Sequence, residues 1–217
     1  MRTFGFPEFL FILEAAQWTL ALSAIAFVGG AILGLAIALM RTSESAWARG
    51  VSTTFIQIFQ GTPLLLQLFL VFFGAPVLGL DINPWVAAGV ALVLNSAAFL
   101  GEIWRGCIEA IPRGQWEAAQ ALSLNYSARM RDVVLPQAFR IALAPTVGYL
   151  VQIIKGTSLA AIIGFVEVTR AGQIVNNATF QPLIVFSVVA AIYFVICWPL
   201  SLLAARMERK RARALAR

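Results

Sequence analysis

Long stretches without a charged residue are the feature that most constrains how this chain can fold. Of its residues, 60% are hydrophobic and 12% are charged, whereas a soluble domain carries about 25% charged residues. About 20 apolar residues in a helix cross the roughly 30 Å hydrocarbon layer of a membrane. Stretches of sufficient length are Thr19–Met40, Gly50–Leu80, Ile82–Gly101, Ala171–Ala205 and, apart from its Lys155, Ile141–Val166. We therefore predict a single all-α domain over residues 1–217, a polytopic membrane protein with five transmembrane helices.

The first 17 residues differ from these stretches. Met1–Gln17 is too short to span and carries Glu8 and Glu14, which predicts an interfacial segment lying on the membrane. No basic region precedes a short apolar core, so the sequence argues against a cleaved signal peptide.

Basic residues are distributed unevenly between the two sides of the predicted bundle. If the N-terminus lies outside, 13 of the 16 Lys and Arg residues fall in the inner loops or in the tail formed by residues 206–217. Positively charged loops stay in the cytoplasm, so we predict this orientation, with the C-terminus cytoplasmic. The membrane topology then explains the net charge of +6, and nucleic-acid binding is not needed to account for it. The basic tail is expected to meet anionic headgroups.

Several kinds of chemistry are excluded by the residues that the chain lacks. It has no histidine, which removes Ser-His and Cys-His nucleophiles and most zinc sites. Cys107 and Cys197 are expected to be buried thiols rather than a disulfide. The only lysines are Lys155 and Lys210, and neither belongs to a phosphate-binding P-loop. We expect no enzyme activity, no metal site and no cofactor in this chain.

Glycine and proline interrupt three of the predicted spans. Gly30 and Gly34 are spaced for close helix packing, most simply inside the bundle. Gly61–Pro63 predicts a kink in the second span. Pro145, ahead of Lys155–Ser158, predicts a strained or interrupted fourth span. Transporters often place binding or gating elements at such discontinuities.

The polar segment of residues 107–140 separates the third and fourth spans. It contains Glu117–Ala119, then Ser123, Val133 and finally Leu135–Pro136. This spacing resembles the EAA loop of ATP-binding-cassette (ABC) importer permeases, whose pattern is E-A-A, three residues, Gly, nine residues, Ile, one residue, Leu-Pro. Ser123 and Val133 are the two departures.

Three further segments resemble polar-amino-acid permeases of that class. They are Phe55–Gln67, Asn95–Gly106 and Ile154–Leu159. The matched blocks occur in the family order and extend over residues 19–205. Gln60 stands where the family commonly has Arg, and Phe99 where it often has Tyr.

The resemblance implies a role for the polar loop as a cytoplasmic coupling element. A short helix over Gln115–Leu124 would dock on a separate ATPase subunit, which would bind ATP and Mg²⁺, and Arg113 and Arg129 would ring the contact. The docking residues would be Gly114, Trp116, Glu117, Ala118, Ala119, Leu122 and Ser123. The simpler alternative is an ordinary amphipathic helix at the membrane interface.

Polar residues inside the spans are candidates for the solute path, because charges there are costly. The candidates are Gln60, Thr62, Asn95, Glu102, Lys155, Thr157 and Ser158. The alternative is structural. Glu102 would pair with Arg105 or Lys155, and Lys155 could instead cap backbone freed by Pro145.

The resemblance thus implies a permease subunit of the bacterial inner membrane that moves a polar amino acid or related zwitterion by alternating access. Its partners would be ATPase subunits, a second permease and an extracytoplasmic solute-binding protein. Ser123 and Gln60 favour a heterodimer over a homodimer. An ion-coupled secondary carrier remains the rival function, with Glu102 as its one intramembrane carboxylate. A membrane enzyme is disfavoured, because no span holds a carboxylate pair.

Overall fold

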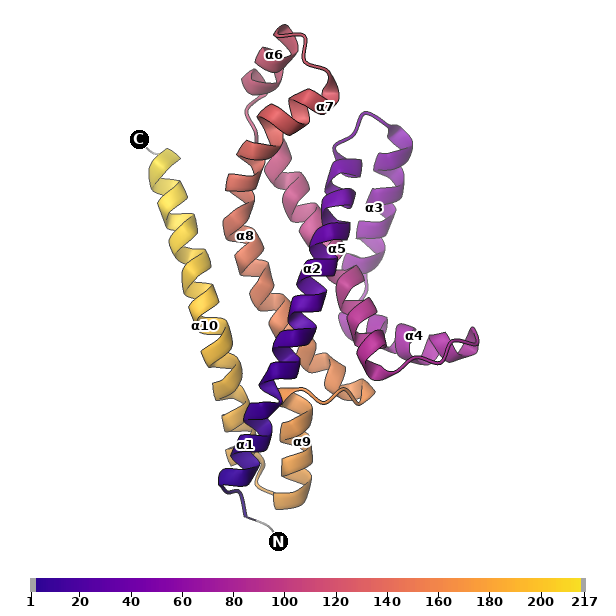
Figure 1. Cartoon of the computed structure of the whole chain (residues 1–217), viewed down its shortest axis with the longest axis vertical. Coiled ribbons are helices and arrows are strands. Elements are labelled where there is room, and N and C mark those ends of the chain that lie inside the picture. Colours follow the sequence, from indigo (N-terminus) through magenta and orange to yellow (C-terminus); the bar gives the residue numbers. More distant parts are fainter. Residues whose placement is uncertain (1–2, 216–217) are drawn as a thin grey trace.

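The computed structural model describes residues 3–215, and these form a bundle of long helices without a β-strand (Figure 1). The α-helices are α1 (Phe6–Glu14), α2 (Ala16–Arg41), α3 (Ala46–Gly61), α4 (Leu64–Val77), α5 (Pro84–Glu109), α6 (Arg113–Ala121), α7 (Tyr126–Ala128), α8 (Leu135–Gly156), α9 (Val168–Thr179) and α10 (Pro182–Leu215). A π-helical segment, η1 (Arg129–Val134), precedes α8, and a 3-10 helix, η2 (Thr157–Ile163), follows it. The predicted all-α class is confirmed.

The first two helices form one nearly continuous element. Ala15 between them keeps a right-handed helical backbone, with φ −64° and ψ −17°. The apolar helix therefore runs from Phe6 to Arg41, through the boundary that the sequence suggested at Gln17. At 1.5 Å per residue its 36 residues extend about 54 Å, more than the hydrocarbon layer needs. The position of the first 17 residues on the membrane surface stays a prediction.

The second predicted span is two helices rather than one kinked helix. α3 and α4 meet at an angle of 100°, and α4 projects sideways from the bundle (Figure 1). Thr62 has extended backbone, with φ −116° and ψ 139°, as expected for a residue that precedes proline. Pro63 then serves as the N-cap of α4. The expected kink is therefore a full change of direction.

The fourth span is not interrupted at Pro145, and its α-helix ends instead within the Lys155–Ser158 segment, at Gly156. α8 runs unbroken from Leu135 to Gly156 with Pro145 inside it. The helix tightens to η2 at Thr157 and ends at Gly164, whose φ of +88° favours glycine. At its other end, Pro136 cannot donate a backbone hydrogen bond, and the wider turns of η1 lie directly before it.

The last predicted span begins later than the sequence suggested. Residues 168–179 form the separate helix α9, which ends at Phe180 in the left-handed conformation. Pro182 opens α10, which continues through the basic tail to Leu215. Among residues 3–215, four helical segments are long and apolar enough to cross a membrane, and the number reaches the predicted five if the bent α3–α4 pair is one broken span rather than a re-entrant loop.

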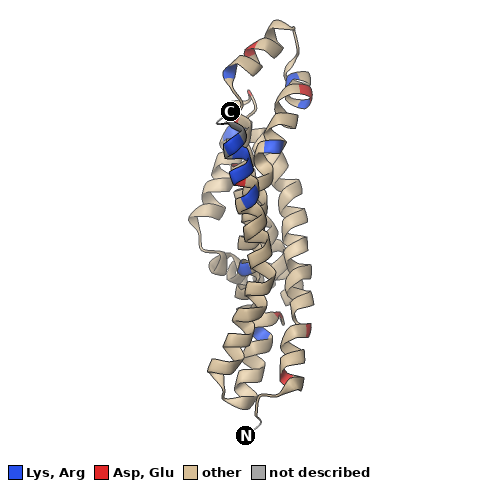
Figure 2. Cartoon of the chain, turned by 90° about the vertical axis from the view of Figure 1, so that its left-hand side faces the viewer, with Lys and Arg blue, Asp and Glu red and all other residues tan. Residues whose placement is uncertain are grey.

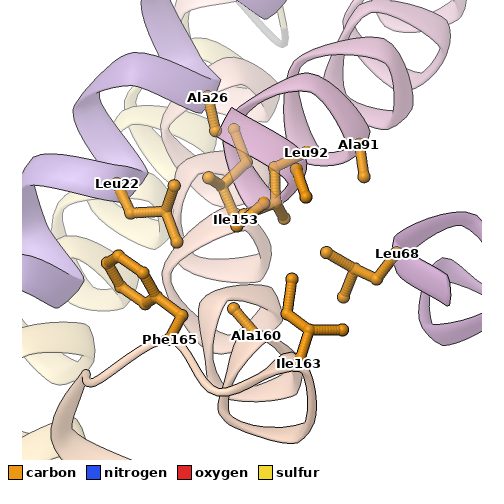
Figure 3. Packing of buried hydrophobic residues seen from close by; sticks show 11 residues of the cluster. Leu22, Ala26, Leu68, Ala91, Leu92, Ile153, Ala160, Ile163 and Phe165 are labelled. Atoms are coloured by element: carbon orange, nitrogen blue, oxygen red, sulfur yellow. The ribbon is translucent and has the colours of Figure 1, made fainter. Parts of the chain in front are cut away.

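The bundle is held together by close packing of α2 against α5. A Cβ placed on Gly30 would lie 2.5 Å from the Cβ of Ser96, and one on Gly34 would lie 3.1 Å from the carbonyl oxygen of Ala97. The prediction that these glycines serve internal contacts is confirmed. A core at the centre joins α2, α4, α5, α8 and η2 (Figure 3). It consists of Leu22, Ala26, Leu68, Ala87, Ala88, Ala91, Leu92, Ile153, Ala160, Ile163 and Phe165.

The two ends of the bundle differ in charge. The N-terminal end lies opposite the end that carries α6 and the C-terminal end of the chain (Figure 1). Most of the Lys and Arg residues that the structure describes lie toward the α6 end of the ribbon (Figure 2). Cys107 and Cys197 are both buried free thiols, as predicted.

Candidate functional site

The polar loop folds into a small helical unit at one end of the bundle. α6 stands beyond the spans and turns back through α7 and η1 into α8 (Figure 1). Ala119 is only 2% exposed, and α6 packs against η1, close to a buried cluster that includes Ile108, Ile111 and Met130. Trp116 is half-buried against the same cluster. This face of α6 therefore anchors the helix to its own chain.

The remaining predicted docking residues of α6 and its C-terminal cap are exposed. Gly114, Glu117, Ala118 and Ser123 are exposed, and Leu122 is 75% exposed. The predicted docking residues thus separate into two faces. The expectation that Ala119 enters a groove on another protein is wrong, because its methyl group is already buried, and Trp116 offers only part of its ring.

Arg129 fixes this unit to the bundle instead of ringing an outer contact. Its guanidinium lies 5.6 Å from the ring centre of Trp116 and 5.7 Å from that of Tyr126, a cation–π arrangement. Its Nη2 is 3.4 Å from Oε1 of Glu44, in the turn between α2 and α3. The Arg129 side chain is 14% exposed. Arg129 therefore links the polar loop to the α2–α3 turn, and the Tyr126 hydroxyl adds a second link by donating to the Thr42 carbonyl oxygen at 3.2 Å.

A buried amide network surrounds the break between α3 and α4. Gln67, 5% exposed, donates from Nε2 to the carbonyl oxygens of Phe59 at 2.8 Å and Thr62 at 3.0 Å. The Nδ2 of Asn95 donates to Gln67 Oε1 at 3.1 Å, and the Tyr149 hydroxyl lies 3.5 Å from Asn95 Oδ1. The carbonyls left without helical donors are thereby satisfied. Gln67 and Tyr149 were missed as site residues, although Gln67 stands four residues after Pro63.

The predicted path residues lie in different environments near this break. Gln60 and Thr62 at the end of α3 are exposed, and so is Lys155 on α8. Ser158 is half-buried, whereas Thr157 is fully buried and donates to the carbonyl oxygen of Ile154 at 2.7 Å. The prediction that Thr157 lines a path is therefore wrong for this subunit.

The end of α8 does reach the start of α4. A Cβ on Gly156 would lie 3.2 Å from Cδ2 of Leu64. The broken helix and the α8–η2 junction therefore meet, which brings Thr62 and Lys155 into one region of the bundle.

Glu102 takes part in an ionic cluster near the α6 end. Arg105 Nε donates to Glu102 Oε2 at 2.9 Å, and Arg105 also pairs with Glu109. Arg41 Nε, from α2, lies 3.9 Å from the Glu102 carboxylate. The predicted Glu102–Arg105 pair is confirmed, and the alternative pair with Lys155 is wrong. Within residues 3–215, Lys155 forms no salt bridge.

Comparison with known proteins identifies the chain. Residues 17–213 match the family described as binding-protein-dependent transport system inner membrane component. The chain belongs to this family. It is a multi-pass permease of the inner membrane, and the resemblance seen in the sequence is confirmed.

Curated relatives agree with this assignment over almost the whole permease. The probable amino-acid ABC transporter permease protein YckA of Bacillus subtilis is 35% identical over 94% of this chain and 91% of its own length. The glutamine transport system permease protein GlnP of Escherichia coli K12 is 36% identical over 94% of both chains. A solved amino acid ABC transporter superposes with a TM-score of 0.87 at 32% identity, covering 96% of this chain and all of that one.

Ser123 occupies a position of the permease loop that favours glycine. Its φ is +58°, a conformation that costs an L-residue about 1–2 kcal/mol. The Leu124 amide donates to the Ala119 carbonyl at 3.2 Å, and the Ser123 amide donates to that of Gln120 at 2.9 Å. These two bonds form a Schellman cap at the end of α6. The glycine of the EAA pattern is thus a backbone requirement, which Ser123 meets under strain.

Glu167, at the opposite end of the permease, is a buried carboxylate that the sequence did not reveal. It is fully buried and accepts hydrogen bonds from the amides of Thr169 and Arg170, both at 2.9 Å, and from the Tyr193 hydroxyl at 2.6 Å. Burial raises the pKa of Glu167 above that of an exposed glutamate, and its hydrogen bonds partly offset that rise. The carboxylate caps α9. Glutamate is not among the preferred N-cap residues, so no sequence signal marked it.

Proposed function

We propose that this permease imports a polar amino acid or related zwitterion, driven by ATP hydrolysis in a separate ATPase subunit. The names of YckA and GlnP and the superposed amino acid transporter support this substrate class. The observation that carries the coupling is the geometry of α6. One face is buried in its own chain while the other presents Glu117 and Leu122 outward.

Docking of the ATPase takes place on that outward face, formed by Gly114, Glu117, Ala118, Leu122 and Ser123. Leu122 supplies the apolar anchor and Glu117 a carboxylate for a basic partner residue. ATP and Mg²⁺ bind to the partner, whose closure displaces α6. The displacement passes through Trp116 and Arg129 to α8, and through Glu44 to α2 and α3. This chain performs no chemistry in the cycle.

The solute passes the region where the broken α3–α4 pair meets α8. Lys155, exposed and outside any ion pair of the described residues, meets the substrate carboxylate. Gln60, Thr62 and Ser158 add hydrogen-bonding groups. Asn95 acts indirectly, because it donates to Gln67, which in turn donates to Thr62. Glu102 lies nearer the α6 end and is largely neutralised by Arg105.

The remaining assembly follows from the charge asymmetry and the family. The α6 end and the C-terminus face the cytoplasm, and the N-terminal end meets a solute-binding protein, which supplies the high-affinity capture. A second permease completes the path. Ser123 and Gln60 depart from the family pattern, which favours a sister subunit, rather than a second copy of this chain, as that partner.

Glu117→Lys tests the coupling face. Uptake in proteoliposomes with the ATPase subunits and loaded binding protein should fall at least tenfold, because a cation replaces the carboxylate on the docking face. Glu208→Lys, an exposed glutamate on α10, is the matched control and should keep uptake within twofold. Normal uptake in Glu117→Lys would show that α6 is not the coupling helix. Uptake that follows an ion gradient without any ATPase would show that the protein is an ion-coupled secondary carrier rather than an ATP-driven importer.

ATPase stimulation identifies the substrate in the same preparation. The complex is assayed with binding protein loaded with each candidate amino acid in turn. Stimulation by one loaded form names the substrate, and stimulation by none of them contradicts the amino-acid class.

A further inference from the structure

α10 is longer than a membrane span. Its 34 residues extend about 51 Å at 1.5 Å per residue, against a hydrocarbon layer of roughly 30 Å. The helix does not end where its apolar sequence ends, after Ala205, but continues to Leu215. Its last turns therefore pass through the headgroup region as ordered helix rather than as a loose tail.

Four exposed cations lie on one face of these last turns. They are Arg206, Arg209, Lys210 and Arg213, and their i, i+3, i+4, i+7 spacing places them within an arc of about 100°. We call this set the basic stripe. Glu208 falls on the opposite side of the helix. Among the residues that the structure describes, no carboxylate pairs with any of the four.

Arg211, between Lys210 and Arg213 in the sequence, does not belong to the basic stripe. Arg211 is half-buried, and its Nη1 donates to the carbonyl oxygen of Ile141 on α8 at 3.4 Å. This contact fixes the rotation of the end of α10 relative to the bundle. The basic stripe is consequently turned away from α8.

The same face of α10 is apolar and exposed nearer the N-terminus of the helix. Ile184 is 48% exposed and Val195 is 68% exposed, and both project from the arc that carries the basic stripe. α10 also stands at the edge of the bundle, against α8 and α9 (Figure 1). An apolar band followed by cations on one helix face matches acyl chains followed by phosphate headgroups.

We propose that the basic stripe binds the headgroups of anionic phospholipids, such as phosphatidylglycerol, in the leaflet next to the α6 end. The stripe holds α10 at a fixed depth, and through the Arg211–Ile141 contact it also fixes the adjoining part of α8. The inference depends on the membrane placement of α10 and not on which solute the permease carries. A negatively charged ATPase surface is the competing occupant. The continuity of the stripe with the uncovered apolar face favours lipid.

Lipid retention measured by native mass spectrometry tests the stripe. The intact complex is taken from nanodiscs of phosphatidylcholine containing phosphatidylglycerol, and the retained lipids are counted. The test variant is R209Q/K210Q/R213Q, and the charge-matched control is R49Q/R131Q/R140Q at exposed arginines of the same end. Each basic residue at an anionic surface strengthens binding about fivefold, so the test variant should lose tenfold or more of its preference for phosphatidylglycerol. The control should stay within twofold.

Four outcomes would overturn the proposal. One is an unchanged preference in the test variant, and another is an equal loss in the control. A third is loss of the co-purified ATPase with lipid preference intact, which would assign the stripe to that protein. The fourth is equal occupancy by inorganic phosphate at matched concentration, which would show an adventitious ion only. Arg206 and Arg211 stay unchanged in both variants, and thermal melting of the detergent-solubilised complex confirms that each is folded.

Discussion

Pro63 and Pro145, two of the prolines inside the predicted spans of this permease, have opposite consequences. Each lacks the amide hydrogen that would bond the carbonyl four residues earlier, which is Phe59 for Pro63 and Ile141 for Pro145. The chain turns by 100° at Pro63. At Pro145, α8 continues without interruption.

The donors around each freed carbonyl explain the difference. At Pro63, the Gln67 amide reaches both the Phe59 and the Thr62 carbonyl oxygens, and Asn95 fixes that amide from α5. At Pro145, a single donor from Arg211 reaches the Ile141 carbonyl oxygen, at 3.4 Å. Backbone groups inside a membrane need partners within the protein. Proline thus removes a donor in both places, and the side chains nearby decide whether a complete break is stable.

The largest effect is expected from Gln67→Leu. This change removes the Gln67 donor of the Thr62 carbonyl and leaves the Phe59 carbonyl with only the longer Asn95 bond at 3.5 Å, so it should lower the free energy of unfolding by about 3 kcal/mol. Denaturant titration of the detergent-solubilised complex measures it. Gln57→Leu, at an exposed position on α3, is the control and should change little. A loss in Gln67→Leu no larger than that of the control would mean that the break is stable without its amide network.

Replacing each proline with alanine should separate the two sites. Pro145→Ala restores a donor for Ile141 in a helix that is already continuous, and it should raise the free energy of unfolding by about 2 kcal/mol. Pro63→Ala allows α3 and α4 to join as one helix, which displaces Gln67 from its partners, so uptake should fall and stability should not rise. The two unfolding curves, measured side by side, check this difference. Gains of equal size at both sites would contradict the comparison.

The sequence predicted the spans, the charged end and the polar loop, because these depend on composition and spacing. It also predicted that Gly30 and Gly34 serve packing, since small residues allow only close approach. It did not predict the 100° turn, because proline alone does not reveal that Gln67 and Asn95 converge on the Phe59 carbonyl. The inward face of α6 was missed for the same reason, since the burial of Ala119 depends on how α6 packs against η1, another element of the chain.

Ser123 differs from both prolines, because its unfavourable backbone conformation has a steric cause and no hydrogen bond is missing. Both bonds of the α6 cap are formed, yet the residue has φ +58°. Ser123→Gly should therefore stabilise the loop by about 1 kcal/mol, and Ser123→Val should destabilise it. Hydrogen exchange of the α6 amides measures the change locally. Faster exchange in the glycine variant would show that the serine side chain itself holds the cap.

The smallest effect is expected from Arg211→Ala, and its interpretation depends on Pro145. The variant removes the donor of the Ile141 carbonyl, and because the hydrogen bond is long and half-exposed, the loss should be about 0.5–1 kcal/mol. In a Pro145→Ala background, the restored amide bonds that carbonyl, so Arg211→Ala should have almost no effect. A double-mutant cycle on the free energy of unfolding isolates this coupling. An equal loss in both backgrounds would show that Arg211 acts through its charge or its packing, and Pro145 would then be tolerated without any side-chain donor.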